Sequence, residues 1–329
     1  MDEIFDAIAV ARGGYMFRGD LIDHGFRDKD IKAAVRAGLL TRLRHGTYAP
    51  AEPTAAMTPE RRNFLVACSV ADKLGDEVVI SNVSAAAGHG CETYGQNLNT
   101  AHLTRLDGKH GRHEAGVIFH VSHTDRRLDV VEVDGRPTVT PLRAVLEAAC
   151  DTSVESGMVV SSSAIRRGLF TQEQLLEAVP ITARWRGARR ASLASRMADG
   201  RLETVGEVRS LHMMWQHGVP LPELQLEIVV DSRVVARVDY GWLGDHHTGE
   251  FDGLVKYGRL NPFATDVGKV LVGEKRREDI VREQHLGMSR WTWSDLAPQR
   301  RKSTADRINR GRQSSRTLYS RNAVHIPVR

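Results

Sequence analysis

The chain is poor in cysteine and in aromatic residues, and it has no long hydrophobic run. Its 3 cysteines in 329 residues, Cys68, Cys91 and Cys150, lie far apart and form no Cys-x-x-Cys pair typical of a zinc or redox centre. We expect buried, unreactive thiols. No apolar stretch approaches the ~20 residues that a membrane-spanning helix needs, and the first residues, MDEIFDAIAV, lack the basic start of a secretory signal. These absences predict a cytoplasmic protein without a membrane partner.

What the chain does contain is enough apolar material for more than one core. Hydrophobic residues make up 41% and charged residues 26% of the 329, which predicts a globular protein of two or three domains. The net charge is only +5, but basic residues gather after Pro298, where Asp306 is the single acid. They are Arg300, Arg301, Lys302, Arg307, Arg310, Arg312, Arg316, Arg321 and Arg329. Few large apolar side chains accompany them, so we expect residues 299–329 to form a mobile tail, whose charges would also suit phosphates.

The first 52 residues predict a small helical domain that ends in a hairpin. Helical patterning marks residues 2–12, 18–24 and 27–38, and glycines end these segments. Leu39–Arg44, a His-Gly turn and Thr47–Ala49 then predict a two-stranded wing. Three short helices with glycine stops followed by a hairpin are typical of a winged helix-turn-helix. We therefore predict a DNA-binding domain over residues 1–52.

Basic residues give this domain a predicted surface for duplex DNA. Those on the third helix are three and four residues apart, so they share one face, and those on the first wing strand alternate along it. The residues are Arg27, Lys29, Lys32, Arg36, Arg42 and Arg44. The alternative interpretation is a helical cap domain that binds no ligand.

Residues 53–195 predict a mixed α/β domain. Thr58 is placed to cap a helix that begins at Pro59 and runs to Leu74. The apolar run at 78–80 predicts a strand, and another helix opens near Ser84. The polar segment MADGRLET at 197–204 marks the next boundary, so we place a third domain at residues 196–298.

Histidines and arginines crowd the middle domain, but their spacing indicates no particular site. No pair forms His-x-x-x-His on a convincing helix, so we expect surface or capping roles rather than a metal centre. The histidines are His89, His102, His110, His113, His120 and His123. The segment RWRGARR at 184–190 interleaves a tryptophan with arginines, which suits nucleic acid but is more typical of a solvated helix start.

The third domain carries the pattern with the most specific chemistry. Residues 234–238 and 250–253 predict two adjacent strands, so that Asp239, Glu250 and Asp252 share one face of a sheet. Facing carboxylates repel each other unless a cation or a proton compensates. We therefore expect Asp239 and Glu250 to bind Mg²⁺, which would activate a water against a phosphate. The alternative is a pair of solvent-facing hairpin residues.

The first two domains resemble AbiEi-type antitoxins over most of residues 1–190. The likeness rests on GLL…R…HGTYA at the end of the first domain, on VVISNVSAAAGHG at 78–90 and on VDGRPTVTPLRAVLEAAC at 133–150. The family implies an N-terminal winged helix, an antitoxin middle domain and a cognate toxin as partner.

The third domain is similar to the restriction-endonuclease-like PD-(D/E)XK fold, in the branch related to very-short-patch-repair nucleases. The likeness rests on VVARVDYGWLGDHHTGEFDGLVKY at 234–257 and on EKRRED at 274–279. That family uses a helix glutamate, a strand aspartate and a Glu-x-Lys, which map onto Glu207, Asp239 and Glu250. Asp252 stands where the lysine is expected, and Lys256 is the nearest lysine. The resemblance implies a three-layer domain in a multidomain α/β (α+β) protein.

Two functions follow from these patterns. The first is a DNA-binding, antitoxin-like transcriptional regulator of a type IV toxin–antitoxin system with a nuclease-like third domain. The second is a Mg²⁺-dependent DNA endonuclease that is targeted by its winged helix. The displaced lysine favours the regulator, whereas the carboxylate cluster favours the enzyme, because an antitoxin needs no such cluster.

Overall fold

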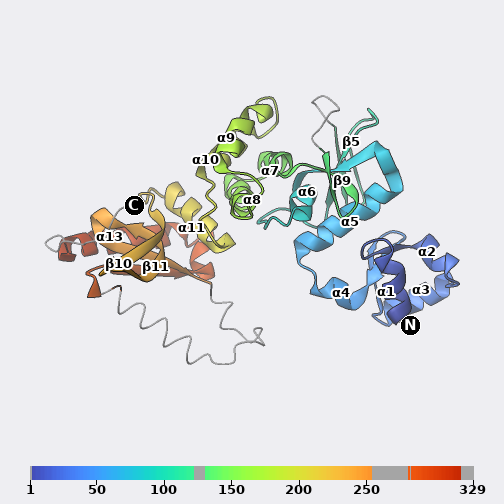
Figure 1. Ribbon diagram of the computed structural model, residues 1–329, viewed down its shortest axis with the longest axis horizontal. Coiled ribbons are helices and arrows are strands. Elements are labelled where there is room, and N and C mark those ends of the chain that lie inside the picture. The colour runs from blue at the N-terminus through green and yellow to red at the C-terminus, as the bar shows by residue number, and fades with distance from the viewer. Residues whose placement is uncertain (1, 122–129, 254–280, 282, 320–329) are drawn as a thin grey trace. The chain divides into compact units, whose positions relative to one another are not determined.

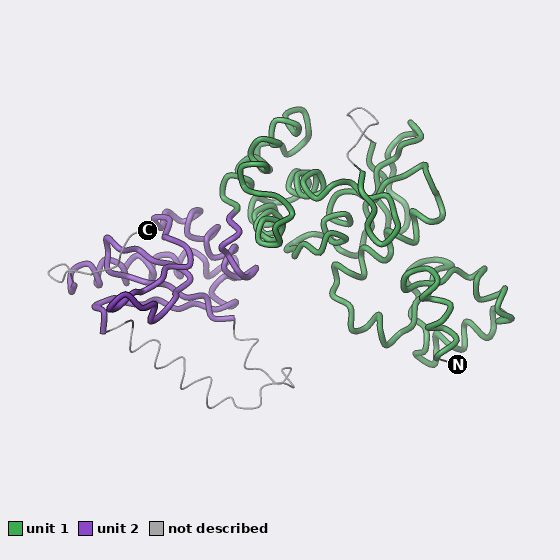
Figure 2. Tube along the Cα trace, in the orientation of Figure 1, with its two compact units in different colours: residues 1–198 green, residues 199–329 purple. Residues whose placement is uncertain are grey.

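The computed structural model describes residues 2–121, 130–253, 281 and 283–319 of the chain. The architecture is mixed α/β, as the sequence predicts, and it divides into two compact units (Figure 1 and Figure 2). Unit 1 comprises residues 1–198 and unit 2 comprises residues 199–329. The division lies close to the boundary predicted from the polar segment 197–204. Lys256, His123 and the EKRRED segment lie outside the described residues.

Short helices and a three-stranded sheet begin unit 1. The helices are α1 (Asp2–Val10), α2 (Arg18–Asp23), α3 (Asp28–Arg36) and α4 (Ala51–Ala56), and the strands are β1 (Met16–Phe17), β2 (Leu40–Arg44) and β3 (Thr47–Pro50). The sheet has the order β1-β3-β2 with antiparallel pairs. The first three helices cover a core that includes Phe5, Leu21 and Ile31. Gly38 follows α3 at φ +73°, a conformation that ends the helix without strain only because the residue has no side chain.

A six-stranded mixed sheet and its helices form the rest of unit 1. The strand order is β6-β7-β5-β4-β9-β8, in which β5–β7 and β4–β9 are parallel pairs. The strands are β4 (Val78–Ile80), β5 (Ala101–Arg105), β6 (Arg112–Glu114), β7 (Val117–Val121), β8 (Val130–Val133) and β9 (Arg136–Val139). The helices are α5 (Pro59–Leu74), α6 (Asn82–Gly88), α7 (Pro141–Cys150), α8 (Val154–Arg166), α9 (Gln172–Ala178) and α10 (Ala188–Met197). Thr58 caps α5 as predicted, since its Oγ1 accepts a 3.2 Å hydrogen bond from the Arg61 N–H.

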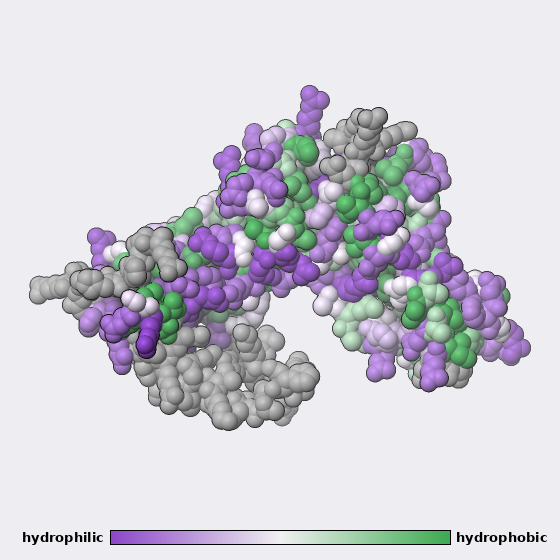
Figure 3. All heavy atoms as spheres, viewed as in Figure 1, coloured by the Kyte–Doolittle hydropathy of each residue, from purple (hydrophilic) through white to green (hydrophobic). Residues whose placement is uncertain are grey.

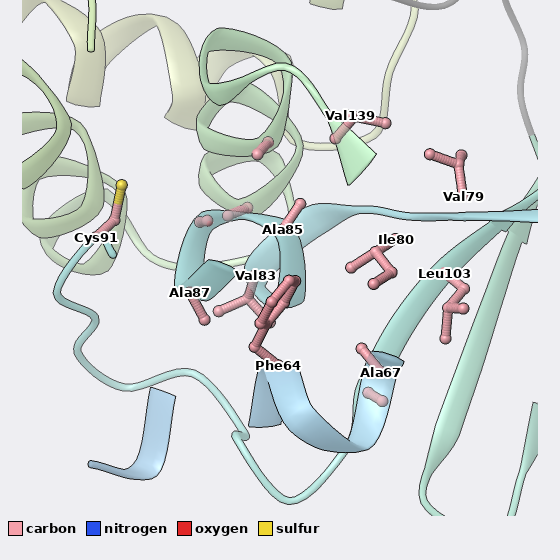
Figure 4. Packing of buried hydrophobic residues seen from close by; sticks show 14 of the residues in the cluster. Phe64, Ala67, Val79, Ile80, Val83, Ala85, Ala87, Cys91, Leu103 and Val139 are labelled. Carbon is pink, nitrogen blue, oxygen red and sulfur yellow. The ribbon is translucent and has the colours of Figure 1, made fainter. Parts of the chain in front are cut away.

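Apolar side chains of α5, α6 and the central strands pack together beside this sheet (Figure 4). Phe64 of α5, Val83 of α6 and Leu103 of β5 are each at most 2% exposed. Gly88 lets α6 approach the Phe64 ring, because a Cβ at that glycine would lie 2.4 Å from Phe64 Cε2. Burial of each large apolar side chain contributes about 1.5–3 kcal/mol. This packing holds β5 against the start of α6. The polar residues His102 and Asn82 lie on these two elements.

Unit 2 is built on a four-stranded sheet of order β10-β11-β12-β13. Its strands are β10 (Glu223–Val230), β11 (Arg233–Trp242), β12 (His247–Asp252) and β13 (Gly287–Thr292), and its helices include α11 (Val205–Gln216) and α13 (Arg301–Tyr319). β13 runs parallel to β12, whereas the other pairs are antiparallel. Both helices lie on one face. Tyr240 Oη donates to the Glu207 carbonyl of α11 at 2.8 Å, and His247 Nδ1 lies 2.8 Å from Ser315 Oγ of α13.

The basic C-terminal segment is a helix, so the prediction of a mobile tail is wrong for residues 301–319. The residues that α13 buries are Thr304, Ala305, Ile308 and Ser315. Gly311 permits a close approach to the sheet, since a Cβ there would lie 2.9 Å from Ser289 Oγ and 3.0 Å from His247 Cε1. The contact face thus consists mainly of small residues at helical spacing, which a search for large apolar side chains overlooks. Residues 320–329 lie outside the described part.

The surface of the protein is predominantly polar in the view of Figure 3, with hydrophobic residues in small groups between hydrophilic ones. Within the described ranges, no helix combines the length and the apolar character needed to cross a membrane. The three cysteines are free and buried. Burial raises the pKa of the Cys68 thiol to about 12, so this group stays protonated at neutral pH. The prediction of buried, unreactive thiols is confirmed.

Candidate functional site

The sheet of unit 2 places the predicted acidic residues in one row across neighbouring strands. Tyr240 pairs with Gly249 in the β11–β12 ladder, so the next positions in that register are Asp239 and Glu250. Glu250 in turn pairs with Arg290 on β13. Opposite residues of paired strands project from the same face, which makes Asp239 and Glu250 neighbours on the face away from Tyr240. Their predicted placement on adjacent strands is confirmed.

Asp239 is half-buried, and its surroundings disfavour its negative charge. Burial and the nearby charge of Glu207, with a smaller contribution from Glu250, raise the pKa of Asp239 to about 7. The Phe251 N–H opposes this shift by donating a 2.8 Å hydrogen bond to Asp239 Oδ2. An unperturbed aspartate has a pKa of about 3.9. The raised value therefore reflects burial of the Asp239 carboxyl group first and the neighbouring negative charges second.

Glu207 has a structural position at the start of α11 as well as a place beside Asp239. It is 5% exposed, and its carboxylate accepts hydrogen bonds from the Glu203 N–H at 2.8 Å and the Thr204 hydroxyl at 2.9 Å. Thr204 Oγ1 accepts in return from the Glu207 N–H at 3.2 Å, so Thr204 is the N-cap of α11. Glu207 thus stabilises the helix terminus while its charge acts on Asp239.

Two further polar residues belong to this cluster and carry no sequence signal. Gln225 on β10 lies opposite Asp239 in the β10–β11 register, and its Nε2 donates to Glu207 Oε2 at 3.0 Å. Its φ of +52° is strained for a residue with a side chain and persists only where the surroundings hold it. Arg290 Nη2 lies 2.9 Å from Glu250 Oε2. Gln225 therefore orients Glu207, and Arg290 orients Glu250, although both occupy ordinary strand sequence.

Asp252 ends β12 two residues after Glu250, so the alternation of the strand places both on the same side. Phe251 between them faces the other way, and its ring meets Trp293 edge-on with centroids 5.0 Å apart. Lys256, the predicted substitute for the family lysine, lies outside the described residues. The roles of Asp252 and Lys256 remain predictions.

The donor atoms of this cluster suit a hard divalent cation. Glu207, Asp239 and Glu250 offer carboxylate oxygens, the ligand type that Mg²⁺ prefers. A cation beside Asp239 would favour its ionised form and offset the repulsion that raises its pKa. These three carboxylates do not form, within the described residues, a group whose ligand atoms all lie within 4.8 Å of one another, so Mg²⁺ binding by Asp239 and Glu250 stays a prediction.

Most of the basic residues predicted to contact DNA are exposed around α3 and β2. Lys29, Lys32 and Arg36 project from α3, opposite its buried face. Arg42 is exposed on β2, and Arg27 is exposed immediately before α3. The structure thus brings these five together on adjacent elements, as the sequence predicts.

Arg44 differs from the other five because it is half-buried. Both Arg42 and Arg44 line a pocket with Val66 of α5 and the loop residue Asn99, but only Arg44 loses much of its exposure there. Burial lowers its pKa. The β2–β3 register shifts between Arg42 and Arg44, so the two arginines do not alternate with Leu43 as in a regular strand. This shift explains why Arg44 is less exposed than Arg42. We therefore leave Arg44 out of the DNA-binding surface.

Two histidines that the sequence does not connect are in contact within unit 1. His102 Nδ1 lies 2.9 Å from His120 Nε2, and the rings stack with centroids 5.1 Å apart. Burial lowers the pKa of His102 to about 3 and also lowers that of His120, so both imidazoles are neutral at physiological pH. The expectation of surface or capping roles is wrong for this pair. It holds for His89, whose Nε2 lies 2.8 Å from the Val139 carbonyl oxygen.

Comparison with known proteins identifies relatives but assigns no family. No protein-family model matches the chain. Two proteins described as uncharacterized, MT2308 of Mycobacterium tuberculosis strain CDC 1551 / Oshkosh and Rv2248 of strain ATCC 25618 / H37Rv, are each 27% identical over 268 residues, which cover 76% of this chain and 92% of theirs. The crystal structure of the RV2827C protein from M. tuberculosis aligns at 17% identity with a TM-score of 0.36, over 58% of this chain and 75% of that one. A TM-score this low does not establish a shared fold.

Proposed function

We propose that this protein binds duplex DNA through residues 1–52 and cleaves phosphodiester bonds with a divalent metal ion in unit 2. The burial of Asp239, which together with the charges of Glu207 and Glu250 raises its pKa to about 7, carries this proposal. Clustered like charges destabilise a fold and gather at functional sites, where a ligand compensates them. The carboxylate donors support Mg²⁺ as the cofactor.

The origin of each acidic residue supports a PD-(D/E)XK-like domain. Glu207 comes from a helix, Asp239 from one strand and Glu250 from the next strand, the elements that carry the corresponding acids in that family. The described helices α11 and α13 lie on one face of the sheet of unit 2, so the three-layer arrangement that the family implies stays a prediction.

Each polar residue of the site in unit 2 would have a separate role. Bound Mg²⁺ would polarise a phosphate oxygen and lower the pKa of a coordinated water. Asp239 and Glu250 would hold the ion. Gln225 fixes one oxygen of Glu207 at 3.0 Å, so this glutamate contributes negative charge from a set position. Arg290, 2.9 Å from Glu250 Oε2, keeps that carboxylate in its place in the row.

We propose that α2, α3 and the β2–β3 hairpin form a winged helix that docks on the duplex. Lys29, Lys32 and Arg36 would contact phosphates from α3, and Arg42 would do so from the hairpin. Such contacts release counterions from the duplex and give an affinity that falls steeply with salt.

The experiment that tests the enzyme is DNA cleavage by the purified full-length chain with Mg²⁺ or Mn²⁺. Wild-type protein should cleave, and Asp239→Asn should bind DNA without cleaving it. Asp231→Asn is the matched control, because Asp231 is exposed in the turn after β10 at φ +48°, which asparagine tolerates. An inactive wild type whose metal affinity is unchanged by Asp239→Asn would exclude the enzyme.

A second candidate is an antitoxin-like transcriptional regulator of a type IV toxin–antitoxin system that retains an inactive nuclease-like domain. It is favoured by the hydrogen bonds that the Glu207 carboxylate accepts at the start of α11, which give this residue a structural reason to be present, and by Asp252 at the position of the family lysine. This candidate predicts duplex binding that neither Mg²⁺ nor Asp239→Asn affects, and binding of a toxin protein. Gel shifts with and without Mg²⁺ separate the two functions.

A further inference from the structure

The central sheet of unit 1 carries a cluster that the proposed function does not use. β5 and β7 are adjacent and parallel, and their register pairs His102 with Ile118 and Thr104 with His120. The two histidines therefore project from the same face on a diagonal, which brings His102 Nδ1 to 2.9 Å from His120 Nε2. Neither belongs to the carboxylate cluster of unit 2 or to the basic surface around α3.

A carboxylate completes this cluster from the end of α7. Asp151, His102 and His120 each offer one ligand atom, and these atoms all lie within 4.8 Å of one another. Asn82 holds the carboxylate, since its Nδ2 donates to Asp151 Oδ2 at 2.6 Å. Asn82 adopts φ +53°, and its N–H donates to Glu147 Oε2 at 2.9 Å. A strained residue that fixes one oxygen of Asp151 leaves the other oxygen available toward the histidines.

We propose that His102, His120 and Asp151 bind a divalent transition-metal ion, Zn²⁺, and leave one coordination position open. Imidazole nitrogen and carboxylate oxygen are established zinc ligands, and three protein ligands with an open fourth position are typical of zinc sites that bind a water or a substrate. Nitrogen donors select against Mg²⁺ and Ca²⁺, which take oxygen ligands. Asn82 is a positioning residue, because a metal-binding carboxylate is usually itself hydrogen-bonded.

The geometry needs only a small adjustment to accept the ion. Zn–N distances of about 2.0–2.1 Å at a tetrahedral angle separate two ligand nitrogens by roughly 3.3 Å. The observed separation of His102 Nδ1 and His120 Nε2 is 2.9 Å, so the rings would move apart by about 0.4 Å. Asp151 is exposed, and one of its oxygens stays bonded to Asn82 while a ligand atom of Asp151 lies within 4.8 Å of those of the histidines.

The open position faces a pocket with a cationic rim. The pocket has a volume of about 230 Å³, and its lining includes His120 and Asp151 together with Arg143, Arg184, Trp185 and Arg186. Guanidinium groups near a metal favour an anion, because they pair with oxyanions in a bidentate way. Arg143 is already paired with Glu147, which also lines the pocket, at 2.7 Å. Arg184 and Arg186 would therefore be the groups that attract an oxyanion of the phosphate type to the open position.

The test begins with metal binding to the full-length chain after removal of bound metal by a chelator. One equivalent of Co²⁺ should give the intense visible absorption of a tetrahedral nitrogen–oxygen site, and Zn²⁺ should displace it. Excess Mg²⁺ should not displace it, because imidazole nitrogens disfavour a cation that takes oxygen ligands. Inorganic phosphate should shift the cobalt spectrum if the open position faces the arginines, and an unchanged spectrum would overturn the oxyanion assignment.

Variants assign the ion to its ligands. His102→Ala and His120→Ala should each weaken Zn²⁺ binding by more than the 10–100-fold typical of a lost outer partner, and the absorption should disappear. His110→Ala removes an exposed histidine of the same domain and should change nothing. Asp239→Asn should also leave zinc binding intact, so a failed nuclease proposal would not affect this result.

Two results would overturn the zinc site. One is a cobalt spectrum that persists in the His102→Ala, His120→Ala double variant, which would show adventitious binding elsewhere. The other is the absence of stoichiometric binding by folded wild-type protein, which would leave a plain histidine–histidine hydrogen bond. If the histidine variants do not fold, Asn82→Gly keeps the backbone conformation that φ +53° requires. It should weaken zinc binding by about 10–100-fold, and unchanged affinity would count against the proposal.

Discussion

The two polar clusters of this protein respond to burial in opposite directions. In unit 2, burial and neighbouring negative charge raise the pKa of Asp239 to about 7. In unit 1, burial lowers the pKa of His102 to about 3. One cause, the loss of hydration around the charged form, favours a protonated acid in one place and a neutral imidazole in the other. A hard cation at the carboxylates would have to displace that proton, whereas the imidazoles already offer neutral nitrogens to a softer one.

The largest expected effect tests whether the clusters act independently. Asp239→Asn should lower Mg²⁺-dependent cleavage by at least about 1,000-fold, because the loss of a cation ligand removes several kcal/mol of transition-state stabilisation. His120→Ala should leave cleavage unchanged. Single-turnover rates at saturating DNA measure both. Equal loss of cleavage in the two variants would show that the clusters are coupled.

A smaller effect on cleavage is expected from substitution of Glu207, because this residue also accepts hydrogen bonds at the start of α11. Glu207→Gln should reduce the cleavage rate by about 10–100-fold, as for a residue that positions or tunes a metal site. Its Tm should stay close to that of the wild type, since the side-chain oxygen of glutamine can still accept the hydrogen bond from the Glu203 N–H. A large fall in Tm with unchanged cleavage would assign Glu207 to the helix cap alone.

The pH dependence of stability sharpens the comparison without any assay of function. The folded pKa of Asp239, about 7, lies above its unfolded value of about 3.9, so between these values the folded state binds the extra proton. Without metal, the free energy of unfolding should therefore fall as the pH rises from about 3.9 to about 7, by up to about 1.4 kcal/mol per pH unit. Above about pH 7 it should level off. Asp239→Asn should lack this slope and be more stable than wild type above about pH 7. Denaturant titrations with a chelator measure this, and parallel pH curves for the two proteins would contradict it.

The smallest expected effect concerns the basic surface around α3, which shares residues with neither cluster. Replacing Lys32 and Arg36 together by Ala should weaken duplex binding and lower the slope of log affinity against log salt by about 0.9 for each lost phosphate contact. The control removes two exposed arginines elsewhere, Arg189 and Arg233. Gel-shift titrations at several salt concentrations give the slopes. An unchanged slope in the Lys32, Arg36 variant would remove α3 from the DNA-binding surface.

Local chemistry made several elements predictable from the sequence. The Thr58 cap, the glycine that follows α3 and the turn between β2 and β3 all lie where short-range hydrogen bonding or backbone freedom requires them. The alternation of β11 and β12 also placed Asp239 beside Glu250, because residues near a hairpin turn have few registers available. Such features depend on neighbours within a few residues.

The C-terminal helix shows where composition misleads. Counting large apolar residues predicts no ordered structure after Pro298, yet α13 packs closely through Ala305, Ile308 and Gly311. Small residues bring the helix and the sheet into close contact. The stabilisation from this packing depends on a partner surface that the local sequence does not contain. The partner here includes Ser289 and His247, which hydrogen-bond to each other within the contact at 2.9 Å.

The sequence by itself determined the mixed α/β class, the main helix and strand positions and the pairing of the acidic residues across one hairpin, because these follow from local periodicity and short-range register. Only the tertiary structure decided that His102 meets His120 and Asp151, and that Gln225 and Arg290 orient the two glutamates. His102 and His120 lie on parallel strands that a crossover connects, and Asp151 follows a distant helix. Long-range packing sets such contacts, and no spacing along the chain encodes them.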